Sequence, residues 1–182
     1  MKSLSICSRL VCLTLLIAGF ATQRSMAQAG DVVVHAATVD ITHFTGTEPV
    51  DQIDMTASFT NNEFAEHRTC EPVDEPFTKG VTVSVQPGLC GAATRKTNII
   101  IPQFTKVSPT LGLFEGFIGK AQIDAVLHKL TRLPGTCGSY NVRVDAVNVN
   151  LAAVKRNPVA VTVTLPDGSS GCLGINTALI DQ

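Results

Sequence analysis

Apolar and polar residues alternate with a period of two along most of this chain, and this pattern restricts the fold more than any other feature. The alternation is clearest in four segments, residues 51–60, 81–86, 159–165 and 173–179. Successive side chains of a strand point to opposite faces, so each segment predicts a β-strand with one buried and one solvated face. Short strands without alternating helices predict an all-β fold, an antiparallel β-sandwich.

The core of this sandwich follows from the apolar phase of each strand. Further strands are predicted at 32–44, 98–104 and 140–151. We expect one apolar residue from each of four well-patterned strands to lie in a shared core between the sheets: Phe59, Val83, Val144 and Val163.

Two segments depart from simple alternation. Within the last predicted strand the apolar phase slips by one residue, which indicates a β-bulge near Ala146 and Val147. Residues 121–130 fit both an amphipathic helix and an alternating strand. We predict a strand there, because glycines precede the segment and Pro134-Gly135 follows it without a helix cap.

The N-terminus has the three parts of a secretory signal peptide. Lys2 and Arg9 give it a positive start, residues 10–21 are mostly apolar, and Ser25 and Ala27 suit the −3 and −1 positions of a cleavage site. A membrane anchor is the alternative, but a helix needs about 20 apolar residues to span a bilayer. Cleavage after Ala29 would also place small residues, Ala27 and Ala29, at these two positions, and of the two sites we favour cleavage after Ala27.

Cleavage there divides the chain into a signal peptide, residues 1–27, and a single β-sandwich domain, residues 28–182. It lowers the number of Lys and Arg residues from 14 to 11 and leaves all 15 acidic ones, so the mature net charge is −4. This balance lacks the strongly basic character of a nucleic-acid binder. We expect an exported protein, periplasmic or extracellular, with no transmembrane segment in the mature chain.

Four cysteines remain after this cleavage: Cys70, Cys90, Cys137 and Cys172. An even number of cysteines in an exported chain predicts two disulfides. A four-thiolate zinc site is the alternative, but such sites use closely spaced C-x-x-C pairs. The spacings here are 20, 47 and 35 residues, which favours disulfides.

Two stretches of the chain, Val81–Gly91 and Val161–Cys172, are similar to each other. Each is a Val/Thr strand that runs into a Pro/Gly turn and a cysteine. Chance similarity in a chain rich in Val and Thr is the alternative to a true internal repeat. A true repeat would give the sandwich two similar halves, with cysteines pairing within each half. Of the three connectivities that four cysteines allow, it predicts Cys70 with Cys90 and Cys137 with Cys172.

The four histidines, His35, His43, His67 and His128, occur singly and form no metal-binding motif. The first two are expected on one face of one strand, but eight residues of strand separate them by about 26 Å. We therefore interpret all four as ordinary solvated or packed histidines, and we predict no bound metal.

Two polar stretches are interpreted as loops. Ser169 and Ser170 follow Asp-Gly, whereas a nucleophile elbow requires Gly-x-Ser-x-Gly between a strand and a helix. The acidic stretch from Glu63 to Glu75 lacks the spaced ligands, central Gly and terminal Glu of an EF-hand loop, so a calcium site is the weaker alternative to a solvated loop. We predict no catalytic residue and no cofactor.

Glycines interrupt one apolar segment, Leu111–Lys120, at Gly112, Gly116 and Gly119. The segment is either a buried crossover between the two halves or an exposed hydrophobic edge. We expect burial, because exposed apolar patches on a monomeric protein are limited in size.

Three stretches in the second half carry a resemblance to known proteins: Phe117-Ile-Gly-Lys-Ala-Gln-Ile123, Tyr140-Asn-Val-Arg-Val-Asp-Ala146 and Asn157-Pro-Val-Ala-Val-Thr-Val163. In this order, with a Gly-rich turn after them, they resemble secreted bacterial all-β proteins that are mostly uncharacterised. The resemblance is clearer in the second half of the chain than in the first. It implies an immunoglobulin-like sandwich and no particular activity.

The leading hypothesis is a non-catalytic exported β-sandwich, an envelope or extracellular structural or binding module. Sandwiches carry their function on loops and edges, so the fold names no ligand. Another envelope or surface protein is the expected kind of partner. The alternative is a strand-donating, pilin-like subunit of a surface fibre, in which residues 32–42 complete a neighbour's sheet. A hydrolytic enzyme without a recognisable motif is the third hypothesis.

Overall fold

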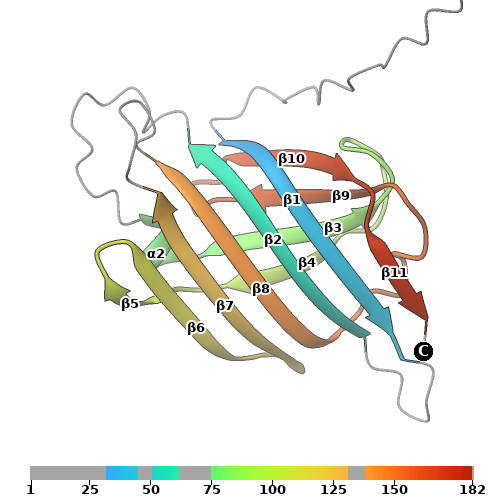
Figure 1. Cartoon of the computed structure of the whole chain (residues 1–182), viewed down its shortest axis with the longest axis horizontal. Coiled ribbons are helices and arrows are strands. Elements are labelled where there is room, and N and C mark those ends of the chain that lie inside the picture. The colour runs from blue at the N-terminus through green and yellow to red at the C-terminus, as the bar shows by residue number, and fades with distance from the viewer. Residues whose placement is uncertain (1–31, 45–50, 62–74, 131–137, 182) are drawn as a thin grey trace, which may run out of the picture.

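The computed structural model describes residues 32–44, 51–61, 75–130 and 138–181, which form two packed β-sheets (Figure 1). In these ranges the regular elements are strands, apart from one short helix, α2 (Glu75–Lys79). The predicted all-β sandwich is confirmed. The immunoglobulin-like order of strands that the resemblance implies stays a prediction.

The larger sheet has seven strands in the order β11-β1-β2-β8-β7-β6-β5, and it lies in front in Figure 1. Neighbouring strands are antiparallel, except that β11 runs parallel to β1. The strands are β1 (Val32–His43), β2 (Asp51–Asn61), β5 (Thr105–Ser108), β6 (Leu111–Ile118), β7 (Ala121–Leu130), β8 (Ser139–Val149) and β11 (Ala178–Asp181).

The smaller sheet has four strands in the order β10-β9-β3-β4. They are β3 (Val81–Pro87), β4 (Thr97–Ile101), β9 (Val159–Thr164) and β10 (Ser170–Ile175). Two hairpins, β3-β4 and β9-β10, meet where Val83 faces Val163 in the β3-β9 ladder. The two similar stretches of the sequence therefore lie side by side at the centre of one sheet.

The core lies between the two sheets and contains the four predicted residues. Phe59, Val83, Val144 and Val163 each expose 1% or less of their surface and belong to one apolar cluster, so this prediction is confirmed. Tyr140 stacks on Phe59 with ring centroids 5.4 Å apart, and Phe77 of α2 approaches the same tyrosine at 6.4 Å. The short helix thus helps to close one end of the core.

Both ambiguous segments are strands in the structure. Residues 121–130 form β7, as predicted. In β8, Val147 and Val149 face consecutive residues of β2, so Asn148 is the extra residue of a β-bulge, and its φ of 64° lies in the left-handed region. The bulge predicted near Ala146 and Val147 therefore exists, one residue further along the chain.

The expected burial of the glycine-rich segment is wrong. Residues 111–118 form β6, next to the short edge strand β5, and Phe117 on this strand is 71% exposed. The physical reason is that Leu113, Glu115 and Phe117 occupy the outward phase of β6, on the face that turns away from the smaller sheet. Gly112 on the inner side is tightly packed, because a Cβ there would lie 2.6 Å from the ring of Phe77 and 2.8 Å from Phe104.

The predicted disulfide pairing is also wrong, because Cys90 is bonded to Cys172. Their Cα atoms lie 5.9 Å apart. This bond excludes both the Cys70–Cys90 and the Cys137–Cys172 pairs. The repeat misled the prediction because strand order, and not sequence similarity, decides which cysteines are close. Cys70 and Cys137 themselves lie outside the described residues.

Several predictions fall outside the described part of the chain. They are the signal peptide at residues 1–27, its cleavage site, and the acidic stretch up to Asp74. In the described ranges, no helix has the length and apolar character to cross a membrane. A disulfide is typical of exported proteins, and export itself stays a prediction.

Candidate functional site

His35 and His43 lie on opposite faces of β1, so the prediction of a shared face is wrong. A β-bulge between Val34 and Ala36 shifts the phase of the strand. His35 is exposed, and its Nε2 lies 2.8 Å from the hydroxyl oxygen of Thr60. His43 is buried at the other end of the strand.

His43 belongs to a small polar network that holds the connection between the two sheets. Its Nδ1 lies 2.9 Å from Oδ1 of Asp51, and its Nε2 lies 3.0 Å from the carbonyl oxygen of Val154. The other carboxylate oxygen of Asp51 accepts a 2.8 Å hydrogen bond from the backbone N–H of Leu151. Both ring nitrogens are engaged, so we interpret this packed histidine as structural.

The described residues offer no obvious metal centre. In these ranges, no group of three or more His, Cys, Asp and Glu side chains is placed to hold a metal ion. His128 is exposed on β7, and His67 lies outside the described part of the chain.

Ser169 lies in the hairpin loop between β9 and β10, as predicted, whereas Ser170 is already a strand residue. Oδ1 of Asp167 accepts hydrogen bonds from the backbone N–H and from the hydroxyl of Ser169, at 2.9 Å and 2.7 Å. This is the arrangement of an Asx turn. Ser170 begins β10. The hydroxyl of Ser169 therefore supports the turn between β9 and β10.

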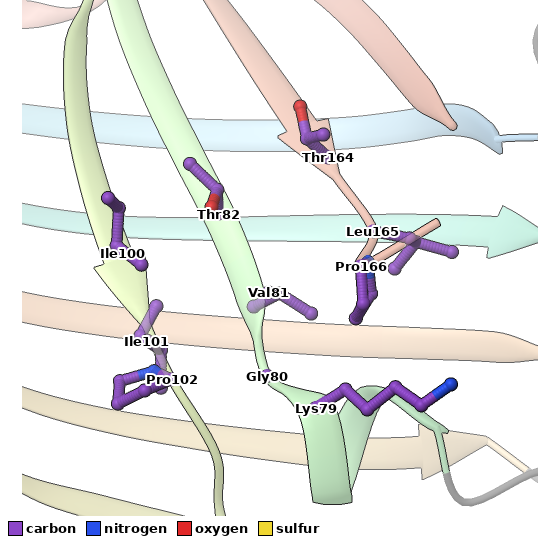
Figure 2. Close-up of a pocket in the computed structure, with 10 residues that line it drawn as sticks. All are labelled: Lys79, Gly80, Val81, Thr82, Ile100, Ile101, Pro102, Thr164, Leu165 and Pro166. Atoms are coloured by element: carbon purple, nitrogen blue, oxygen red, sulfur yellow. The ribbon is translucent and has the colours of Figure 1, made fainter. Parts of the chain in front are cut away.

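A shallow groove lies at one end of the smaller sheet, where β3, β4 and β9 meet the last residue of α2 (Figure 2). Thr82 of β3 and Thr164 of β9 are paired on neighbouring strands, and Ile100 and Lys79 also line the groove. The groove has a volume of about 70 Å³. Pockets for organic ligands usually enclose roughly 300 to 1,000 Å³. This groove therefore has room for only a few atoms.

The outer face of the larger sheet carries a straight row of acidic residues, here called the acidic row. Its members pair in register across five neighbouring strands: Asp40 with Asp54, Asp54 with Asp145, Asp145 with Asp124, and Asp124 with Glu115. Each occupies the polar phase of its strand and points away from the core. Strands lie about 4.8 Å apart, so the row extends over roughly 19 Å.

Exposed apolar side chains border the acidic row on both sides. On one side lie Phe117 of β6 and Val147 of β8, which are 71% and 37% exposed. On the other side Leu113 of β6, 42% exposed, pairs with Val126 of β7. The face therefore presents carboxylates between exposed apolar side chains.

Charge compensation within this face is incomplete. Arg143 donates a 2.8 Å hydrogen bond to Oδ2 of Asp54. Among the described residues, Asp40, Asp124 and Glu115 form no ion pair. Like charges directly opposite each other destabilise a sheet, and an exposed ion pair stabilises it only weakly. We therefore expect the acidic row to lower the stability of the free protein.

Sequence reasoning missed the acidic row. Alternation alone puts each of its residues on the solvated face of a strand. Their alignment depends on the register of five strands that come from distant parts of the chain.

Comparison with known proteins gave no relatives: no protein-family model, no curated protein and no solved structure matches this chain.

Proposed function

We propose that the protein is an exported, non-catalytic β-sandwich that acts as a binding module in the envelope or outside the cell. Its docking surface is the outer face of the larger sheet, and its partner presents a cationic protein surface. The observation that carries this proposal is the in-register acidic row between two exposed apolar borders.

Charge complementarity argues for a cationic partner. The row brings five carboxylates onto one face, and Arg143 forms an ion pair with one of them, Asp54. Lys and Arg side chains of a partner would remove the repulsion that the free face retains. Complementary charge also speeds association and rejects partners of the wrong sign.

The apolar borders argue for a folded or extended polypeptide as the partner. Phe117, Leu113 and Val147 expose a large part of their surface. Burying apolar area stabilises a complex by about 25 cal/mol per Å². A surface that combines cationic and apolar side chains would satisfy both parts of this face.

Strand donation stays an untested alternative. Residues 32–42, the segment expected to be donated, belong to β1, which pairs with β2 on one side and β11 on the other. No observation in the described residues favours donation over docking on the sheet face.

Binding of a labelled oligolysine peptide to the mature protein tests the proposal, with an oligoglutamate peptide as the reference. We expect binding of oligolysine only, and loss of binding as salt rises from about 10 mM to about 1 M, since the Debye length falls from roughly 30 Å to 3 Å. Asp124→Asn should weaken binding several-fold. Asp167→Asn removes one negative charge from a loop outside the row and should leave binding nearly unchanged. Equal effects of the two substitutions would contradict the proposal.

A further inference from the structure

A second charged region lies at one end of the sandwich and is here called the basic end. It consists of Arg95, Lys96, Lys155 and Arg156, all exposed. The two loops that carry these side chains, residues 88–96 and 150–158, contain no Asp or Glu. The basic end therefore gathers four of the 11 basic residues expected in the mature chain.

Hydrogen bonds tie these two loops together. The backbone N–H of Gly88 donates to the carbonyl oxygen of Pro158 at 2.8 Å. The hydroxyl of Thr97, next to the first loop, donates to the carbonyl oxygen of Asn150 at 2.7 Å. In Figure 1 both loops lie at the right-hand end of the sandwich, beyond the end of β3 and before the start of β9. The four cations thus lie on two neighbouring loops at one end of the sandwich.

Among the described residues, the four cations of the basic end form no ion pair. Asp51 contacts the second loop at Leu151, but its carboxylate is also engaged by His43 and its side chain is only 17% exposed. The basic end therefore remains available to an anionic surface.

We infer that the cationic partner of the acidic row is the basic end of a second copy of this chain. The inference rests on the proposed function, since it takes the outer face of the larger sheet as the docking surface. The charges match: the five carboxylates of the row and Arg143 carry a net charge of −4. The basic end carries four positive charges.

The contact joins two different surfaces of the molecule, so it is heterologous. Each copy presents one acidic row and one basic end, and association repeats from copy to copy unless the rotation between neighbours closes a ring. In the resulting assembly, the basic end of each copy forms ion pairs with the acidic row of the next copy. The assembly needs no exchange of strands and weakens as salt rises.

Sedimentation velocity of the mature protein over a range of concentrations tests this inference. We expect concentration-dependent association at about 10 mM salt and a monomer at about 1 M salt. A row-reversed variant, Asp124→Lys with Asp145→Lys, and an end-reversed variant, Lys155→Glu with Arg156→Glu, should each associate at least tenfold more weakly. Circular dichroism establishes that both variants are folded.

Mixing the two variants provides the decisive measurement. The intact basic end of the first variant fits the intact acidic row of the second, so association should return in the mixture. A protein that stays monomeric at low salt, or that associates regardless of either reversal, overturns the second copy as partner. If such a monomer still binds oligolysine, the proposed function stands and only the second copy as partner is overturned. If the protein neither associates nor binds oligolysine, both the proposed function and this inference are contradicted.

Discussion

The outer faces of the two sheets differ in how far the chain itself covers them. On the smaller sheet, Ser84, Gln86 and Thr162 point away from the core yet expose 6% or less of their surface. The loop after β3 folds back over Gln86, whose side-chain amide donates to the carbonyl oxygens of Leu89 and Ala92 at 3.3 Å and 3.4 Å, and the Cys90–Cys172 bond holds this loop to β10. On the larger sheet, the outer face is open along the acidic row and its apolar borders.

This difference indicates where the molecule binds. The smaller sheet covers much of its outer face with its own chain, at residues 88–96, and the groove left at its end is small. The larger sheet exposes aligned carboxylates, of which Asp40, Asp124 and Glu115 form no ion pair among the described residues, and like charges opposite each other destabilise a sheet. A surface that reduces stability when free is better explained by a partner than by folding.

The largest expected effect comes from removing the bond that holds the covering loop. Cys90 and Cys172 are 82 residues apart, so the chain-entropy relation gives a loss of about 4.5 kcal/mol in the free energy of unfolding for the Cys90→Ser, Cys172→Ser variant. Urea denaturation measures it. Amide hydrogen exchange at Ser84 and Gln86 should also accelerate. In β7, exchange that occurs by local opening, without global unfolding, should not accelerate. A loss under about 1 kcal/mol would show that the loop stays in place without the bond.

Two glycines of β10 test two different contacts of this strand. One glycine packs against β1 of the larger sheet, and the other lies on the outer face of the smaller sheet. A Cβ on Gly171 would lie 2.5 Å from the carbonyl oxygen of Val32 in β1, so Gly171→Ala should lower the free energy of unfolding by roughly 1 to 3 kcal/mol. A Cβ on Gly174 would lie 3.4 Å from the tip of the Leu89 side chain. Gly174→Ala should be neutral or stabilise by up to about 1 kcal/mol. Equal losses in thermal unfolding would refute this distinction.

Two hydrogen-bonded serine–asparagine pairs, one on the outer face of each sheet, allow the two faces to be compared directly. Ser84 on the covered face donates a 2.8 Å hydrogen bond to Asn98, and Ser58 on the open face accepts one of 3.0 Å from Asn141. Ser84→Ala should cost about 1 kcal/mol, because the hydroxyl that is removed belongs to a side chain only 5% exposed and makes this bond largely away from water. Ser58→Ala should cost only a few tenths of a kcal/mol, because water replaces the hydroxyl. Chemical denaturation of both variants side by side checks the order, and a reversed order would mean that the open face is the less solvated one.

The smallest effect has the opposite sign. Asp124 lies between Glu115 and Asp145, so Asp124→Asn should raise the free energy of unfolding by a few tenths of a kcal/mol through relief of repulsion. The gain should shrink at high salt. Asp167→Asn serves as the control outside the row. Destabilisation by Asp124→Asn would show that the row is stabilised within the free protein.

Much of the fold could be predicted from the sequence, because its cause is local. The four core residues were predicted correctly, since the period of two fixes which side of a strand each residue occupies. The strand at 121–130 was also predicted correctly. The β1 bulge was missed, because the strand gains one residue there without an interruption in its sequence pattern, and the predicted face of His43 was therefore wrong.

By itself, then, the sequence determined the phase of each strand and the class of the fold. Only the tertiary structure decided the register between strands and the order of strands in each sheet. Register aligned acidic residues from positions as distant as 40 and 145 in one row, and strand order brought Cys90 to Cys172. The physical reason is that phase depends on neighbours along the chain, whereas register and order depend on how distant strands pair and pack.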